Sequence, residues 1–393
     1  MSKYAKLLMV TTENNNKFYI MEEKGGVIHI EYGRVESSST KLTKPLSQWD
    51  SIYKSKTKKG YKDVTAYAAE TTVVNDDPKD NKFDKTGMMK VDEFMSLMQQ
   101  YTDGLVKATY SVTAKQVTQA QVDDAQKVLT ELMSMKGGIE SEVNAKLVEL
   151  YTIIPRRMGK VQYHILPTIK LEDILDKEQD NLDAMASQVA IQQTSTVKKD
   201  KVVSNKQTIL DNIGITMKEY KGIPPEIKYL TDQCTRNKIA AIFEVNSSVE
   251  DKIYNDWLIK QKNKTSRILI HGTKNTSVIP ILKTRLQIRP QGNFQFSGKV
   301  YGNGNYFSEV VSKSLNYTGY DNDKVLLVYE VHTGNPFIYD GWYRGNSFTL
   351  DYKNLSQRGY DSTYVKAGGG LLNTEIIAYK EEQNRIKYII WLK

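Results

Sequence analysis

Residues 301–317 read YGNGNYFSEVVSKSLNY, and this stretch predicts most about how the C-terminal half is built. A glycine turn comes first, the aromatic pair Tyr306-Phe307 follows, and a short helical segment ends at Tyr317. Two tyrosine rings at this spacing can enclose a flat heteroaromatic ring, to which Ser314 can give a hydrogen bond. An ordinary loop with core aromatics fits the same residues, because the chain has 25 tyrosines.

Two further segments carry candidate chemistry. His271-Gly272-Thr273 follows an apolar strand, which places an imidazole and an accessible backbone amide at a sheet rim. A core histidine that caps a strand is an equal alternative. Glu375 enters the apolar run 371–379, where burial of an unpaired charge is costly. The carboxylate therefore faces a cleft with hydrogen bonds, or it lies on an exposed strand face.

The region from about residue 209 to the end mixes short apolar runs with Gly, Asn and Asp turns. This pattern predicts an antiparallel, loop-rich α+β domain. Gly302-Asn303-Gly304 lacks the third glycine of a dinucleotide-binding fingerprint, so a Rossmann site is not supported. The predicted strands include residues 268–270, 325–329, 376–379 and 388–391.

The first 200 residues predict two different units. Residues 4–35 alternate as strands, and a short helix is expected over 47–59. Helical periodicity then runs from about residue 91 to 192, which predicts an all-helical bundle. Polar stretches at 75–90 and 193–207 are expected to be linkers. The fold class is thus multidomain α+β.

A lysine cluster marks the N-terminal region. No acid interrupts it, and its cations repel one another unless an anion such as a phosphate backbone neutralises them. A solvated helix face is the plainer interpretation. The cluster consists of Lys54, Lys56, Lys58, Lys59 and Lys62.

Composition excludes several classes of protein. The chain has 393 residues, a net charge of +9, four histidines and one cysteine, Cys234. A disulfide scaffold and a multi-cysteine metal site are excluded, and we expect no metal. No apolar run reaches the ~18 residues of a membrane span. The first apolar run is too short for a signal peptide, so we expect a protein that is not secreted and does not enter a membrane.

In their order, these segments resemble the poly(ADP-ribose) polymerase family of ADP-ribosyltransferases. The resemblance rests on residues 270–273, 302–317 and 372–375, which look like the family's His-Tyr-Glu triad with its flanks. It implies an ADP-ribosyltransferase catalytic domain over 206–393, a regulatory helical domain over 91–205 and a WGR-like DNA-binding domain over 1–90. The WGR signature here is Tyr32-Gly33-Arg34, with tyrosine in place of tryptophan.

The resemblance also implies roles for single residues. Glu375, His271 and Tyr306 are expected to be catalytic. NAD+ is expected to be consumed as a substrate, so that no cofactor is needed. Where many relatives carry an arginine, this chain has Gln287, flanked by Arg285 and Arg289. The residues expected to bind NAD+ are Gly272, Thr273, Ser314, Tyr317 and Lys313. Those expected to bind DNA are Tyr32, Gly33, Arg34, Lys54, Lys56, Lys58 and Lys59.

The implied function is transfer of ADP-ribose from NAD+ to protein acceptors, including the enzyme itself, with release of nicotinamide. Stimulation by DNA strand-break ends, without sequence preference, and elongation to poly(ADP-ribose) are expected as part of DNA repair. The alternatives are a mono-ADP-ribosyltransferase with the same triad and a DNA-end-binding scaffold with a vestigial site. A nuclear location is expected in a eukaryote or its virus, and a cytoplasmic one otherwise.

Overall fold

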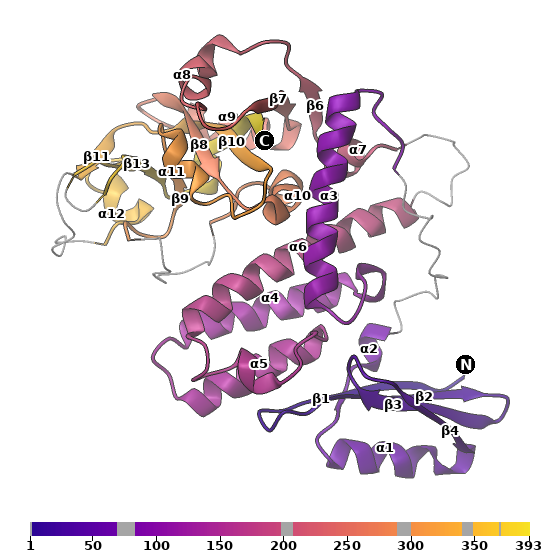
Figure 1. The fold of residues 1–393 in the computed structure, drawn as a ribbon. Helices are drawn as coiled ribbons and strands as arrows, with labels where there is room; N and C mark the ends of the chain where they lie inside the picture. Colours follow the sequence, from indigo (N-terminus) through magenta and orange to yellow (C-terminus); the bar gives the residue numbers. More distant parts are fainter. Residues whose placement is uncertain (1, 69–82, 198–206, 289–299, 340–348, 369–370) are drawn as a thin grey trace. The chain divides into compact units, whose positions relative to one another are not determined.

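The computed structural model describes residues 2–68, 83–197, 207–288, 300–339, 349–368 and 371–393. Parts of both predicted linkers (75–82 and 198–206), together with Arg289, lie outside the described residues. By packing, the chain forms two compact units, one of Met1–Asp80 with Asp103–Thr196 and one of Asn81–Thr102 with Val197–Lys393. Figure 1 shows the elements of each unit. The division into three functional domains stays a prediction.

The first unit begins with a five-stranded antiparallel sheet in the order β4-β3-β2-β1-β5. The helix α1 (Trp49–Lys58) lies along one face of this sheet (Figure 1), where Trp49 joins a core with Leu7 and Met21. The expected strands and the expected helix of this region are therefore present. The remaining elements are β1 (Tyr4–Val10), β2 (Asn16–Lys24), β3 (Val27–Arg34), β4 (Thr40–Pro45), β5 (Lys62–Asp63) and α2 (Thr65–Ala68).

Four longer helices follow, as the helical periodicity predicts. Their apolar faces are buried, as Leu129 and Leu132 of α4 illustrate. A buried ion pair, with an N···O distance of 2.7 Å, joins Arg156, which follows α5, to Glu178 of α6. The guanidinium of Arg156 also lies 4.1 Å from the centre of the Tyr110 ring. The helices are α3 (Met89–Thr109), α4 (Gln119–Ser134), α5 (Glu140–Ile153) and α6 (Leu171–Val197).

The helix α3 contributes to both units, because the division falls between residues 102 and 103. Its first half packs in the second unit, where the ring of Phe94 lies 4.9 Å from that of Phe243 and 5.7 Å from that of Trp391. The residues of α3 are therefore divided between the two units.

The second unit holds two sheets, a five-stranded one in the order β6-β7-β14-β10-β8 and a four-stranded one in the order β11-β12-β13-β9. An isolated bridge between Ile270 and Ser308 connects β8 to β9, and thus one sheet to the other. The strands are β6 (Thr216–Glu219), β7 (Ile239–Asn246), β8 (Ser266–Gly272), β9 (Asn305–Phe307), β10 (Lys324–His332), β11 (Pro336–Tyr339), β12 (Ser362–Val365), β13 (Glu375–Ala378) and β14 (Asn384–Leu392). The helices are α7 (Ile209–Ile213), α8 (Lys228–Thr231), α9 (Ser248–Ile259), α10 (Asn275–Thr284), α11 (Val311–Leu315) and α12 (Tyr352–Ser356).

Two expectations need correction. The C-terminal unit is not wholly antiparallel, since β11 and β12 pair in parallel. The segments expected to be linkers are partly helical, because α3 already begins at Met89 and α6 continues to Val197. An α+β chain with an N-terminal sheet, a helical middle region and a C-terminal α+β domain is confirmed. Within the described ranges, no helix has both the length and the apolar character that crossing a bilayer requires.

Candidate active site

The candidate site begins at the end of β8, where His271 and Gly272 are the last two residues. The Nδ1 atom of His271 lies 3.0 Å from the carbonyl oxygen of Tyr306. Because a carbonyl only accepts, Nδ1 must carry the proton, which fixes the tautomer of the ring. The imidazole of β8 is thereby oriented by the backbone of β9.

Gly272 lies against the short helix α11. A Cβ atom at this position would stand 1.9 Å from the carbonyl oxygen of Ser314, so only glycine fits. Ser314 itself is 3% exposed. Gly272 and Ser314, which are both expected to bind NAD+, thus lie together. The backbone of Ser314 occupies the space into which a side chain at position 272 would project.

The phenol of Tyr306 closes the glycine turn that precedes β9. Its hydroxyl donates to the carbonyl of Gly302 at 2.8 Å and accepts from the backbone N–H of Tyr301 at 3.0 Å. Gly302 has a positive φ of 91°, and a Cβ there would meet the carbonyl oxygen of Leu350 at 2.0 Å. Burial raises the pKa of Tyr306 far above its usual value, so the phenol stays neutral.

Glu375 is the first residue of β13 and is only 6% exposed. Its Oε1 atom lies 2.7 Å from Nζ of Lys313, which α11 supplies one residue before Ser314. Burial alone would lower the pKa of Lys313, but the hydrogen bond and charge of Glu375 outweigh burial and raise it. The carboxylate is therefore buried and ion-paired, and the exposed-strand alternative for Glu375 is wrong.

Strand pairing brings these residues together from positions 104 apart in sequence. β8 is bridged to β9 by reciprocal hydrogen bonds of 2.9 and 3.0 Å between Ile270 and Ser308. β9 pairs with β13 in the register Ile376 opposite Phe307. The hydroxyl of Ser308 also donates to the carbonyl of Thr374, at 3.1 Å. His271, Tyr306 and Glu375 thus lie on three neighbouring strands.

The two predicted ring-clamping tyrosines have different surroundings. Tyr306 is bonded into the turn, whereas Tyr317 lies just beyond α11 and is 48% exposed. The ammonium of Lys313 lies 5.8 Å from the centre of the Tyr317 ring. Thr273 is partly buried between β8 and α10. A ring sandwich between Tyr306 and Tyr317 stays a prediction.

The sequence interpretation did not assign a role to Tyr301. Its ring packs edge-on against Tyr339, with centroids 5.4 Å apart. Burial, and then the charge of Glu375, raise the pKa of its phenol. Tyr301 therefore belongs to the surroundings of the carboxylate. Its place at the start of the glycine turn was the available signal, but tyrosine is too common in this chain for that signal to stand out.

The predicted DNA-binding residues lie in the first unit. The ammonium of Lys56 lies 3.9 Å from the centre of the Tyr19 ring, 5.4 Å from that of Tyr61 and 5.6 Å from that of Tyr32. Burial, together with the charges of Lys59 and Lys17, lowers the pKa of Lys56. Lys56 is therefore enclosed by three tyrosine rings, while the remaining predicted lysines of this helical segment are exposed: Lys54, Lys58 and Lys59.

Arg34, the last residue of the signature, makes hydrogen bonds within the first unit. It donates to the carbonyl of Asn14 at 2.9 Å, to the side-chain oxygen of Asn14 at 3.1 Å and to the carbonyl of Gly159 at 2.5 Å. Gly33 precedes it, and Tyr32 stacks on Tyr19 with ring centroids 5.5 Å apart. The signature therefore ties the sheet to the loop after α5.

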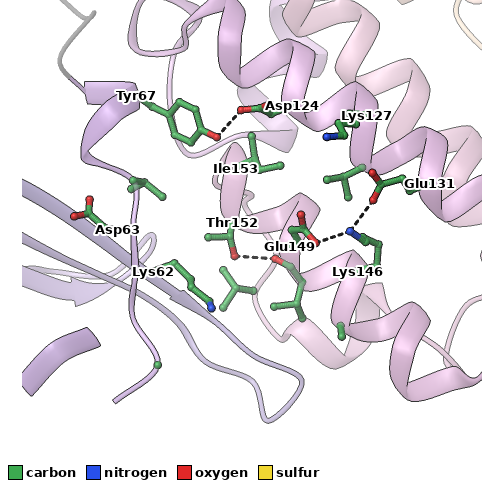
Figure 2. A pocket seen from close by; sticks show the side chains of 16 residues that line it. Lys62, Asp63, Tyr67, Asp124, Lys127, Glu131, Lys146, Glu149, Thr152 and Ile153 are labelled. Carbon is green, nitrogen blue, oxygen red and sulfur yellow. Dashed lines mark hydrogen bonds and ion pairs between the residues drawn. The ribbon is translucent and has the colours of Figure 1, made fainter. Parts of the chain in front are cut away.

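A pocket of about 730 Å³ also lies in the first unit, between β5 and α2 on one side and α4 and α5 on the other (Figure 2). Tyr67 donates to Asp124 across it at 2.7 Å. On its helical wall, Lys146 pairs with Glu131 at 2.7 Å and with Glu149 at 2.8 Å (Figure 2). None of the predicted NAD+ residues lines it.

Comparison with known proteins identifies the C-terminal unit. Residues 217–393 match the family described as the poly(ADP-ribose) polymerase catalytic domain. Protein 100L of Invertebrate iridescent virus 6, named as poly [ADP-ribose] polymerase-like, is 56% identical over 167 residues, which are 42% of this chain and 92% of that protein. Protein 101L of the same virus is 43% identical over 191 residues, which are 48% of this chain and 79% of that protein.

A plant relative matches almost the whole chain. Poly [ADP-ribose] polymerase 2 of Arabidopsis thaliana is 23% identical over 467 aligned positions, which cover 97% of this chain and 71% of that protein. The similarity to the viral protein is high and covers nearly all of it. The chain therefore belongs to the poly(ADP-ribose) polymerase family and is an NAD+ ADP-ribosyltransferase.

Proposed function

We propose that the three neighbouring strands β8, β9 and β13 bind NAD+ and that Glu375 directs the transfer of its ADP-ribose. The observation that carries this proposal is the burial of the Glu375 carboxylate against the ammonium of Lys313, at 2.7 Å. Burying a carboxylate costs free energy unless the charge is paired, and buried, paired carboxylates are frequent at functional sites. Glu375 begins β13, which pairs with β9, the strand that carries Tyr306.

The chemical problem is cleavage of the bond between C1′ of the ribose and the nicotinamide nitrogen. Its electron pair leaves with nicotinamide, and positive charge develops on the ribose, as in glycoside hydrolysis. An acceptor oxygen then bonds to C1′ and gives up its proton. Glu375 hydrogen-bonds the 2′-hydroxyl of that ribose, stabilises the developing charge, and orients or deprotonates the acceptor.

The other residues bind and orient the substrate. Gly272 offers its backbone N–H and C=O to the carboxamide, and Ser314 adds a second hydrogen bond. His271 anchors ribose hydroxyls, held in orientation by the Tyr306 carbonyl. Tyr317, which is half exposed beyond α11, stacks on the nicotinamide ring, and Tyr306 forms the opposite wall of that ring's site. Further contacts come from Thr273, toward the adenosine side, and from Lys313, which holds Glu375.

We further propose that broken DNA stimulates the transfer and binds the first unit. The exposed lysines on α1 support this proposal, because exposed ammonium groups can contact the phosphates of DNA. Such contacts do not depend on the base sequence. The hydrogen bonds of Arg34 link the sheet to the helical region, and α3 belongs to both units. A change at the sheet therefore has a covalent route, through α3, to the catalytic unit.

Incubation with radiolabelled NAD+, with and without nicked duplex DNA, tests these proposals together. We expect nicotinamide release, label on the protein itself and on added acceptors, and an increase when nicked DNA is present. A ladder on a sizing gel indicates poly(ADP-ribose), whereas a single band indicates mono-ADP-ribosylation. A protein that binds nicked DNA but incorporates no label from NAD+ would contradict the proposed site.

A further inference from the structure

Arg285 has an unusual backbone conformation directly after α10. Its φ is 73° and its ψ is 169°. For a residue with a side chain, this region is strained and is populated almost only by glycine. Such strain persists where the surrounding structure fixes the residue, so the contacts of Arg285 must hold it there.

The side chain of Arg285 points into the protein interior. One Nη atom donates to the backbone carbonyl of Glu381 at 2.8 Å. Burial raises the pKa of Glu250, and the hydrogen bond from Ile386 and the positive charge of Arg285 oppose that rise. The same charge opposes the rise that burial causes in the pKa of the Tyr329 phenol. Within the part of the chain that the structure describes, the buried Nε atom of Arg285 has no hydrogen-bond partner. This guanidinium is therefore anchored on its inner side to the Glu381 carbonyl.

The residues that follow Arg285 are fixed to two parts of the candidate site. The carbonyl of Leu286 accepts from the side chain of Asn305 at 3.2 Å, and Asn305 precedes Tyr306 on β9. The N–H of Ile288 donates to the Glu381 carboxylate at 2.8 Å, shortly after β13. Upstream, α10 begins two residues after Thr273. The loop 285–288 therefore connects the three segments that the proposed function uses.

We propose that Arg285 is a positioning residue for NAD+ binding. Its inward guanidinium holds the loop 285–288 in a glycine-type path, which sets the spacing between α10 and the β9 strand without any contact between Arg285 and the substrate. This inference rests on the proposed NAD+ site. It also means that the guanidinium of Arg285, which is bonded to Glu381, does not stand in for the arginine that Gln287 replaces.

The test compares two arginine substitutions. Arg285→Gly relieves the backbone strain but removes the anchor, so the loop is expected to lose its fixed path. Arg385→Gln is the matched control, because Arg385 is also partly buried and its guanidinium pairs with two carboxylates, those of Glu330 at 2.7 Å and Asp251 at 2.9 Å. Since Arg285→Gly also removes a positive charge that favours the ionised form of the buried Glu250, the variant is also made together with Glu250→Gln.

The measurements are KM and kcat for NAD+ and the Kd for carba-NAD+, an analogue whose carbocyclic ring cannot form the oxocarbenium ion. For Arg285→Gly, alone and with Glu250→Gln, we expect KM and Kd to rise about tenfold while kcat falls much less, because substrate binding loses its preorganised wall. Arg285→Lys is expected to recover part of the loss. Arg385→Gln is expected to lower the melting temperature with KM unchanged.

Two outcomes would overturn the inference and are distinguishable. If Arg285→Gly only lowers the melting temperature, as the control does, and KM and Kd stay as in the wild type, Arg285 is merely structural. If the wild-type chain itself does not bind carba-NAD+, the proposed NAD+ site fails, and the positioning role fails with it.

Discussion

The ion pair between Glu375 and Lys313 allows stability and catalysis to be separated by a double-mutant cycle. The variants are Glu375→Gln, Lys313→Met and the combination of both. The side chains are 8% and 17% exposed, and their charged atoms are 2.7 Å apart. Coulomb's law gives a gross attraction of about 6 kcal/mol for this distance at an effective dielectric constant of about 20. Desolvation of the two ions offsets most of it.

Stability should respond to the pair rather than to either residue. Lys313→Met leaves the Glu375 carboxylate buried without a cation, which should lower the free energy of unfolding by about 3–5 kcal/mol. Glu375→Gln should cost less, because the amide still offers an acceptor to the ammonium. The double variant should return to within about 1 kcal/mol of the wild type, since neither charge is left alone. Urea unfolding measures all three.

Activity should fall in the two variants that lack Glu375. Loss of a group that stabilises the developing charge costs about 10²–10³ in rate, so Glu375→Gln and the double variant should release nicotinamide that much more slowly while still binding carba-NAD+. A double variant as unstable as Lys313→Met would contradict the ion pair. A Glu375→Gln enzyme with wild-type nicotinamide release would refute the role of Glu375.

Three other predictions concern single contacts. Gly272→Ala should abolish nicotinamide release and destabilise the fold by about 1–3 kcal/mol, because the new Cβ meets the Ser314 carbonyl oxygen at 1.9 Å; an active, stable variant would contradict the packing of α11. Tyr306→Phe should lower the free energy of unfolding by about 1–3 kcal/mol, since Gly302 and a neighbouring amide lose their partner; equal urea midpoints would oppose this. Alanine at the exposed lysines of α1 and of its C-terminal cap should flatten the salt dependence of nicked-DNA binding measured by fluorescence anisotropy, while Lys56→Met should change it less. Those lysines are Lys54, Lys58 and Lys59.

Sequence reasoning could name the candidate site residues because they lie in short, ordered motifs. The spacing around Tyr306 and the carboxylate in an apolar strand could both be read directly. Periodicity also predicted the long helices, since it reports which face is buried. It could not predict that β11 and β12 run parallel, because the pairing partner of a short strand depends on tertiary topology.

Arginine and lysine side chains show where sequence reasoning stops. The sequence does not show whether the side chain of a lysine or arginine in a motif faces solvent, an aromatic ring or a buried acid. Arg285 stands beside Gln287 in sequence and suggests an anion site, yet its guanidinium is buried against Glu381. Lys56 belongs to the basic run, yet three tyrosines enclose it. Only the fold decides between these environments.

The same distinction sets the strength expected of the proposed DNA contact. Of the four lysines expected to bind DNA, Lys56 is enclosed by tyrosines, which leaves three exposed cations, Lys54, Lys58 and Lys59. Three phosphate contacts predict a slope of about −2.7 for log K against log salt, or a loss of about 40-fold in affinity between 50 and 200 mM salt. A markedly steeper slope would mean that other cations take part. If Arg34 is one of them, it exchanges its hydrogen bond to Gly159 for a phosphate. Because that bond ties the sheet to the helical region, such an exchange would itself couple DNA binding to the helices. A slope near −2.7 would leave the bond intact and would remove Arg34 from the proposed interface.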